Sequence, residues 1–134
     1  MIRTHARRFT RHTLASIGTE KPNLAVFACV DSMLSRSIVW DSTKAAASFY
    51  TDGRMAGESL RILASSEPPI DTYYTTTLFD DSLAHPAPCT GRSTLYAASI
   101  AAGLMLARFA MHLRGHPIPR DTILNLLADE LISK

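Results

Sequence analysis

The stretch Leu24-Ala25-Val26-Phe27-Ala28-Cys29-Val30, which ends at Asp31, decides the fold class of this chain of 134 residues. A short run without polar side chains predicts a strand that is buried on both faces, as in the interior of a parallel sheet. Asp31 or Ser32 can cap a following helix, which the pattern predicts from Met33 to about Ala47. Strand, acidic residue and helix together predict an α/β unit.

Further strand patterns follow this unit. Ser48–Thr51 and Gly57–Ser65 predict two strands, with a turn at Asp52-Gly53-Arg54 between them. Tyr73–Phe79 is rich in Tyr and Thr, which favours another strand. The segment from Asp80 to Gly91 contains several Pro and Gly residues and is expected to be a long loop.

The last third of the chain is dominated by an apolar segment, Leu95–Leu113, that is rich in Ala and Gly. We expect a helix that packs closely on the sheet. A membrane span is the less favoured alternative, because Arg108 would interrupt the roughly 18–20 apolar residues that a span needs. Asp121–Ile132 predicts either a closing strand with a turn or a short helix. The expected fold is therefore α/β and partly Rossmann-like, with a mixed sheet and a long buried helix.

Composition and charge exclude several classes of protein. The chain is 46% hydrophobic and 19% charged with a formal net charge of +2, which describes one compact domain and gives no sign of a nucleic-acid partner. Two cysteines far apart form neither a CxxC motif nor a disulfide framework, so a cytoplasmic location is expected. The six glycines form neither of the common phosphate-binding loops.

Residues 1–23 form a basic N-terminal segment. It contains Arg3, Arg7, Arg8 and Arg11 and no acidic residue before Glu20. It lacks the apolar core of a secretory signal, and an amphipathic helix is the favoured interpretation. The composition also fits an organellar transit peptide, and phosphate binding by the arginines is a further alternative that no motif supports.

Asp31 and Arg36 are the first candidates for a functional site. A carboxylate at the carboxyl end of a parallel strand lies where open α/β sheets bind ligands, and there it could hold Mg²⁺ together with phosphate oxygens. The alternative is that Asp31 only caps the next helix. Arg36 follows one helical turn later and can reach the same crevice, or it can be a solvated surface arginine.

Three other groups are weaker candidates. Cys89 precedes the apolar helix and could be a nucleophile with a lowered pKa, although a non-catalytic cysteine is favoured. Asp52 and Arg54 could present a charged pair near a strand end or form only a local ion pair. Arg92-Ser93-Thr94 could bind an anion or cap the helix.

Four segments, in their order along the chain, resemble the ThiF family of adenylyltransferases, which shares its fold with ubiquitin-activating enzymes. They are Val26–Arg36 (VFACVDSMLSR), Phe49–Glu58 (FYTDGRMAGE), Cys89–Tyr96 (CTGRSTLY) and Ala101–Met105 (AAGLM). The resemblance covers about Leu24 to Ile132 and implies that ATP and Mg²⁺ activate the C-terminal carboxylate of a ubiquitin-like or sulfur-carrier protein. It assigns Mg²⁺ and nucleotide binding to Asp31 with Arg36, and acyl or sulfur transfer to Cys89.

The chain departs from that family at several points. Ser32 and Trp40 stand where the family usually has Asn, and the glycine-rich nucleotide-binding half has no counterpart. Residues 24–134 are therefore expected to be the carboxyl-terminal half of such a domain, inactive alone, with the missing half or a second copy as its partner. The alternatives are an α/β interaction module or split subunit that docks on a partner, and a small protein anchored in a membrane through Leu95–Leu113.

Overall fold

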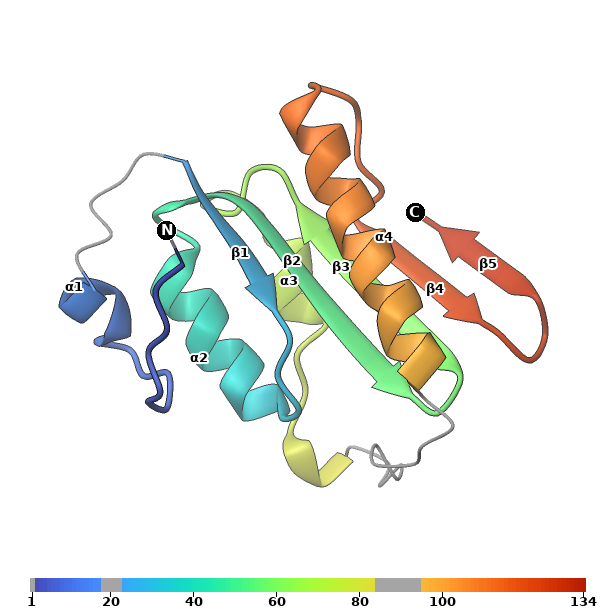
Figure 1. Ribbon diagram of the computed structural model, residues 1–134, viewed down its shortest axis with the longest axis horizontal. Helices are drawn as coiled ribbons and strands as arrows, with labels where there is room; N and C mark the ends of the chain where they lie inside the picture. The colour runs from blue at the N-terminus through green and yellow to red at the C-terminus, as the bar shows by residue number, and fades with distance from the viewer. Residues whose placement is uncertain (1, 18–22, 84–94) are drawn as a thin grey trace.

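The computed structural model describes residues 2–17, 23–83 and 95–134, and it shows a mixed α/β domain. Five strands form one sheet in the order β1-β2-β3-β4-β5, with three helices of two turns or less and two longer ones (Figure 1). The elements are α1 (Thr13–Ile17), β1 (Leu24–Ala28), α2 (Met33–Thr43), β2 (Ala47–Ala56), β3 (Ser59–Ser65), α3 (Tyr73–Thr76), the 3₁₀ turn η1 (Asp81–Leu83), α4 (Leu95–Leu113), β4 (Asp121–Asn125) and β5 (Glu130–Ser133). The predicted α/β class is confirmed.

The sheet is parallel at one edge and antiparallel elsewhere. β1 pairs in parallel with β2, with Phe27 beside Thr51. The connections from β2 to β3 and from β4 to β5 are short, so these strands pair antiparallel, and β3 also pairs antiparallel with β4. The parallel pair needs a helical crossover, which α2 supplies.

Helices cover the two faces of the sheet. On one face Trp40 of α2 and Tyr74 of α3 pack against Tyr50 and Leu63. On the other face Ala97, Ala101 and Met105 of α4 pack against β3 through a second buried cluster. Side chains alternate between faces along a strand, so neighbouring residues of β2 and β3 belong to different clusters. The result is two thin apolar layers on either side of the sheet.

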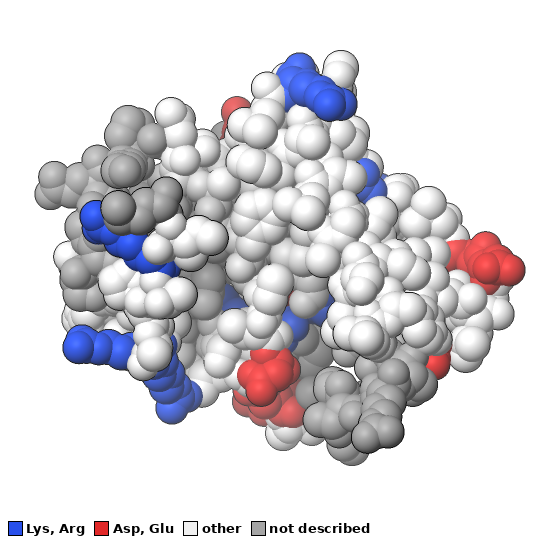
Figure 2. All heavy atoms as spheres, viewed as in Figure 1, with Lys and Arg blue, Asp and Glu red and all other residues white. Residues whose placement is uncertain are grey.

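The long helix α4 contacts the sheet along one side only. By length and composition α4 could cross a membrane. In this fold only 17% of its 18-residue apolar window is buried, so most of the helix surface is exposed. Small residues let the helix approach the sheet, and Gly53 of β2 leaves room for the Met105 side chain. In Figure 2 the face that carries α4 is mostly free of charged side chains. The helix is thus a core element on one side and an apolar surface on the other.

Several expected elements differ from the structure. β2 runs straight through Asp52-Gly53-Arg54, where a turn was predicted, because Asp52 and Arg54 find buried partners. Tyr73–Thr76 is a helical turn rather than a strand, since the Asp71 carboxylate accepts hydrogen bonds from the backbone N–H groups of Tyr73 and Tyr74. Asp121–Ile132 takes the strand-and-turn alternative and adds β5.

The helices at the start of the chain are shorter than expected. Helix α2 ends at Thr43, before the predicted Ala47. Of the basic segment, only Thr13–Ile17 is helical among the described residues, and residues 2–10 follow an irregular path. Four arginines within nine residues repel one another, which offsets the small gain from a short amphipathic helix.

Candidate functional site

The structure places Asp31 and Arg36 on the lining of one cavity at the carboxyl end of β1. The cavity has a volume of about 290 Å³, and its far wall is formed by α4. Its lining residues are Cys29, Val30, Asp31, Arg36, Gly53, Met55, Ala98, Ala101, Ala102 and Met105. Methionine and alanine side chains supply most of the wall, so the cavity is apolar with one acidic and one basic residue at its edge.

Arg36 is held by the protein itself and is not a solvated surface arginine. Its side chain is 6% exposed, and its Nε donates to Oδ1 of Asp52 at 3.0 Å. Its Nη2 donates to the backbone oxygen of Gly53 at 3.2 Å. These hydrogen bonds connect α2 to β2. The Arg36 side chain also forms part of the cavity lining.

Asp52 is the centre of a buried polar network. Its carboxylate is fully buried and also accepts from Nε of Arg54 at 2.7 Å and from the Tyr74 hydroxyl at 3.0 Å. Arg54 donates in turn to the backbone oxygen and hydroxyl of Thr77 at 2.8 and 2.9 Å. One carboxylate between two guanidinium groups leaves the cluster with a net positive charge.

Two tyrosines close the network. The hydroxyl groups of Tyr50 and Tyr74 lie 3.0 Å apart. Burial, followed by the neighbouring hydroxyl of Tyr74, raises the pKa of Tyr50 well above its ordinary value. Burial and then the charge of Asp52 raise the pKa of Tyr74. Both hydroxyls stay protonated at neutral pH, so they act here as hydrogen-bonding groups that stabilise the fold.

The N-terminus of α2 is already occupied by a carboxylate. Ser32 is the N-cap and accepts from the N–H of Ser35 at 3.1 Å, so the cap role left open between two residues belongs to Ser32. Asp81 of η1 accepts from the N–H groups of Met33 and Leu34 at 2.6 and 3.2 Å. A helix N-terminus is where a phosphate group would bind, and Asp81 fills that position.

These residues fit a Mg²⁺–nucleotide site poorly. Within residues 2–17, 23–83 and 95–134 no three His, Cys, Asp or Glu side chains come together in a group that could hold a metal ion. Asp31 is exposed and stands alone as a carboxylate at the cavity, while Arg36 is engaged by Asp52. Binding of ATP and Mg²⁺ stays a prediction that rests on the resemblance alone.

The prediction that Cys89 is a nucleophile is not tested. Cys89 and Arg92-Ser93-Thr94 lie outside the described residues. Cys29, which had been noted only as part of the apolar strand, is a free and exposed cysteine on the cavity wall. Burial, with the charge of Asp52 as a smaller cause, raises the pKa of the Cys29 thiol. A raised pKa disfavours the thiolate, so Cys29 is not set up as a nucleophile.

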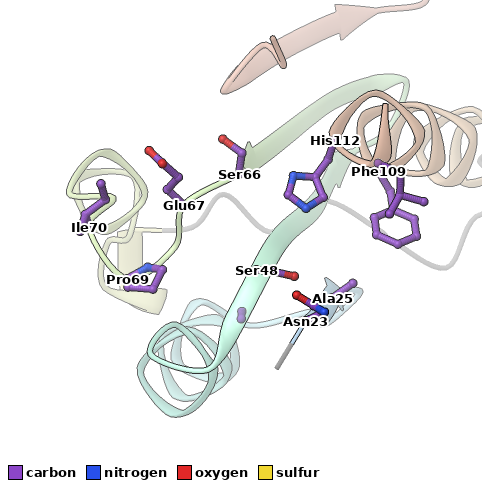
Figure 3. A pocket seen from close by; sticks show the side chains of 11 residues that line it. Asn23, Ala25, Ser48, Ser66, Glu67, Pro69, Ile70, Phe109 and His112 are labelled. Carbon is purple, nitrogen blue, oxygen red and sulfur yellow. The ribbon is translucent and has the colours of Figure 1, made fainter. Parts of the chain in front are cut away.

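A larger cavity that sequence reasoning missed lies at the opposite end of β1. It has a volume of about 580 Å³, and Figure 3 shows the side chains of Ser48 and His112 near its centre. The His112 ring packs against the ring of Phe49, with centroids 5.2 Å apart. Its lining residues are Asn23, Ala25, Ala47, Ser48, Ser66, Glu67, Pro69, Ile70, Phe109, His112 and Leu113. They come from four separate segments, and no spacing in the sequence indicates that they meet.

The fold and these two cavities define a mixed α/β domain. Comparison with known proteins finds a solved structure with a similar fold. The solved structure titled "Crystal Structure of SeMet PaaA" matches with a TM-score of 0.56 and 12% sequence identity. The match covers 92% of this chain and 45% of that chain, so this chain spans less than half the length of PaaA. No family model matches the chain, and no curated protein matches it.

The expected membership of the ThiF family is corrected by these comparisons. The structural likeness is to PaaA, no family model supports an adenylyltransferase, and an identity of 12% is evidence of fold alone. The adenylyltransferase function, which depended on that membership, is withdrawn with it. The physical reason is that a strand ending in Asp and a helix of small residues satisfy general α/β packing, so such motifs occur in many families.

Proposed function

We propose that this chain is a protein-interaction module that completes its sheet with a strand from another polypeptide, along the free edge of β1. The observation that carries the proposal is the position of β1. Its sequence, Leu24–Ala28, has the character of an interior strand, yet it lies at the edge of the sheet, where β2 is its one strand neighbour among residues 2–17, 23–83 and 95–134. An unpaired edge presents a row of backbone N–H and C=O groups that a further strand can use.

Both faces of β1 make apolar contacts with the helices, while Phe27 stays 38% exposed at the open edge. On one face Val26 and Ala28 join the cluster around Trp40. On the other face the Phe27 ring lies 5.5 Å from Phe109 of α4 and 5.9 Å from Phe49. Parallel sheets with both faces covered usually contain several parallel strands, whereas β1 and β2 form a single parallel pair within the described part of the chain.

The two edges of the sheet differ in the features that prevent unwanted pairing. Edge strands are normally protected by charged residues, Pro or bulges. The β5 edge carries Glu130, with Lys134 directly after it, and every residue of β5 is exposed. β1 carries no charge and no Pro, and its one register irregularity falls at its first residue. In the described part of the chain, no backbone hydrogen bond reaches β1 from outside the sheet.

A partner with further α/β structure is the occupant that best fits this edge. A single extended peptide would pair with the backbone but would leave the apolar rims beside Phe27 and Val26 uncovered. The partner is therefore expected to contribute a strand together with at least one covering helix.

Site-specific cross-linking tests this proposal. A photoreactive phenylalanine at Phe27, which is 38% exposed, is expected to form one discrete adduct with another polypeptide in cells of the source organism. The same group at Ile132 of β5, which is 45% exposed and lies on the sheet face opposite α4, is the control and should not give that adduct. The captured polypeptide must then bind the purified chain, and Ala25→Lys on β1 should weaken binding at least about tenfold.

Ile132→Lys on β5 is the matched control and should leave that affinity unchanged. Three outcomes would reject the proposal. They are an adduct that contains only two copies of this chain, a partner whose affinity does not depend on Ala25→Lys, and equal cross-linking from both edges.

A further inference from the structure

We propose that the outer side of α4 is a homodimer interface, at which two copies of the helix pack antiparallel across a row of small residues. This inference concerns a different surface from the β1 edge and does not depend on a partner there. Its starting point is the exposure of α4. Leu95 is 76%, Leu106 59% and Leu113 69% exposed on a helix that has almost no polar side chains.

The outer side of α4 has a shallow groove between large side chains, which close helix packing requires. Ser99, Gly103 and Ala107 follow one another at intervals of four residues, and all three are exposed. A Cβ added at Gly103 would meet no atom within 4 Å, so the backbone is open to an approaching surface at that point. Large side chains stand on either side of this row, Leu106 on one and Ile100 on the other. Ridges beside a shallow groove allow two identical helices to interdigitate.

The absence of charge on this side favours a second copy over a charged partner. Arg108 is the only Lys, Arg, Asp or Glu within α4, and its Nη2 donates to the Thr122 hydroxyl at 3.0 Å, toward the sheet. When two copies of α4 pack about a two-fold axis between them, no like charges within the helices are therefore brought together. Figure 2 shows the same mostly uncharged face, with the charged groups toward its rim.

The charges at the two ends of the helix favour the antiparallel direction. Glu58 lies at the N-terminal end, where it accepts a hydrogen bond from the Tyr96 hydroxyl at 3.1 Å. Arg114 directly follows the C-terminal end of α4. When the second helix runs in the opposite direction, each Arg114 comes toward the Glu58 of the other copy, and the helix dipoles oppose each other.

The apolar surface of α4 continues onto the neighbouring strands. A helix of this length is about 28 Å long and about 10 Å wide, which is less than the roughly 800 Å² per partner of a stable interface. Leu131 pairs with Leu124 on the same face of the sheet, beyond the edge of α4, and is 61% exposed. It extends the apolar surface from the helix across β4 and β5.

Sedimentation velocity of the whole chain, from about 1 to about 100 µM, tests the proposal. The wild type should form a dimer, and Gly103→Leu should weaken dimerisation at least about tenfold by filling the groove. Leucine is a better helix former than glycine and has free space at this position in the monomer, so the variant should also unfold at a higher temperature. Loss of the dimer can then not be attributed to misfolding.

A charge exchange tests the direction of packing. Glu58→Arg or Arg114→Glu alone should weaken the dimer about two- to five-fold, and the two changes together should restore it. Leu34→Lys, on the exposed side of α2 and 59% exposed, is the control and should have no effect.

The proposal is overturned if the wild type stays monomeric at 100 µM, or if Gly103→Leu does not change the dissociation constant. Tight binding of the wild type to phosphatidylcholine vesicles, abolished by Leu106→Lys, would also overturn it in favour of a membrane surface.

Discussion

Asp52 carries its charge at a position with no exposure to solvent, between Arg36 and Arg54. A buried ion is tolerated only when partners replace its lost hydration, and this carboxylate accepts from two guanidinium groups and from the Tyr74 hydroxyl. The pair of arginines depends equally on Asp52. The network therefore ties α2, β2 and the segment after α3 together, at the base of the smaller cavity.

Replacing Asp52 is expected to have a large effect on stability. Asp52→Ala leaves two buried guanidinium groups without their carboxylate and should lower the free energy of unfolding by about 3–5 kcal/mol. Asp52→Asn keeps the shape but not the charge and should cost nearly as much. Urea unfolding followed by the fluorescence of Trp40, the one tryptophan of the chain, measures both changes.

The control for Asp52 is an exposed ion pair. Asp41 and Lys44 lie 2.9 Å apart with side chains 47% and 39% exposed. Asp41→Ala should change the free energy of unfolding by less than about 1 kcal/mol. Similar losses for the two aspartates would show that burial does not govern the network.

Asp121 gives the stability of the chain a defined dependence on pH. Arg61 donates two hydrogen bonds to its carboxylate, at 3.0 and 2.8 Å, and Tyr73 donates a third at 2.6 Å. The Arg61 guanidinium lowers the pKa of Asp121 below its ordinary value of 3.8. A lowered pKa in the folded state stabilises the fold above the ordinary value, and this contribution is lost as the pH falls through the folded pKa.

Stability should therefore decrease as the pH is lowered from about 4 to about 2, and Asp121→Asn should remove part of that decrease. Thermal unfolding at a series of pH values measures it. Asp129→Asn, at an exposed turn position, makes the same chemical change and should leave the pH profile as in the wild type. An Asp121→Asn profile parallel to that of the wild type would refute the assignment.

At the scale of elements, Gly53 controls how closely α4 packs on β2. An added Cβ would lie 2.8 Å from Sδ of Met105, which is 3% exposed. Gly53→Val should lower the free energy of unfolding by about 1–3 kcal/mol, because the methionine must leave a packed site. Met105→Ala in the same chain should relieve much of this loss. A double-mutant cycle in urea measures the coupling, and strictly additive effects would show that the two residues do not oppose each other.

The elements that the sequence predicts well are those with a strong local signal. β1 and α4 follow from apolar runs whose lengths suit a strand and a helix. β2 and α3 depend on tertiary contacts that no local pattern shows. Asp52 and Arg36 are 16 residues apart, and Tyr74 reaches Asp52 from 22 residues away, so the predicted turn inside β2 could not be corrected from sequence.

The candidate site was predictable only in its location. The rule for the carboxyl ends of parallel strands pointed to the end of β1, where Asp31 and Arg36 line one cavity, while a binding role for either residue stays a prediction. It could not indicate that Asp81 occupies the N-terminus of α2, because η1 lies 47 residues further along the chain. The cavity around His112 is lined by four segments, within residues 23–25, 47–48, 66–70 and 109–113, and no pattern in the sequence indicates that these segments meet.

At the scale of the whole molecule, two surfaces stand out among the described residues. No described strand pairs with the outer edge of β1, and the outer side of α4 exposes large apolar side chains. An isolated domain that shows both is expected to associate, since exposed apolar patches and open edges favour contact with other chains. The two surfaces can be tested by separate variants, Ala25→Lys on β1 and Gly103→Leu on α4.

Amide hydrogen exchange of β1 tests the central claim most directly. In the isolated chain, residues 24–28 should exchange much faster than residues 59–65 of β3, which is paired on both sides. Addition of the polypeptide captured through Phe27 should slow exchange in β1 at least about tenfold and leave β5 unchanged. Slow exchange of β1 in the isolated chain, or protection of β5 instead, would contradict the account.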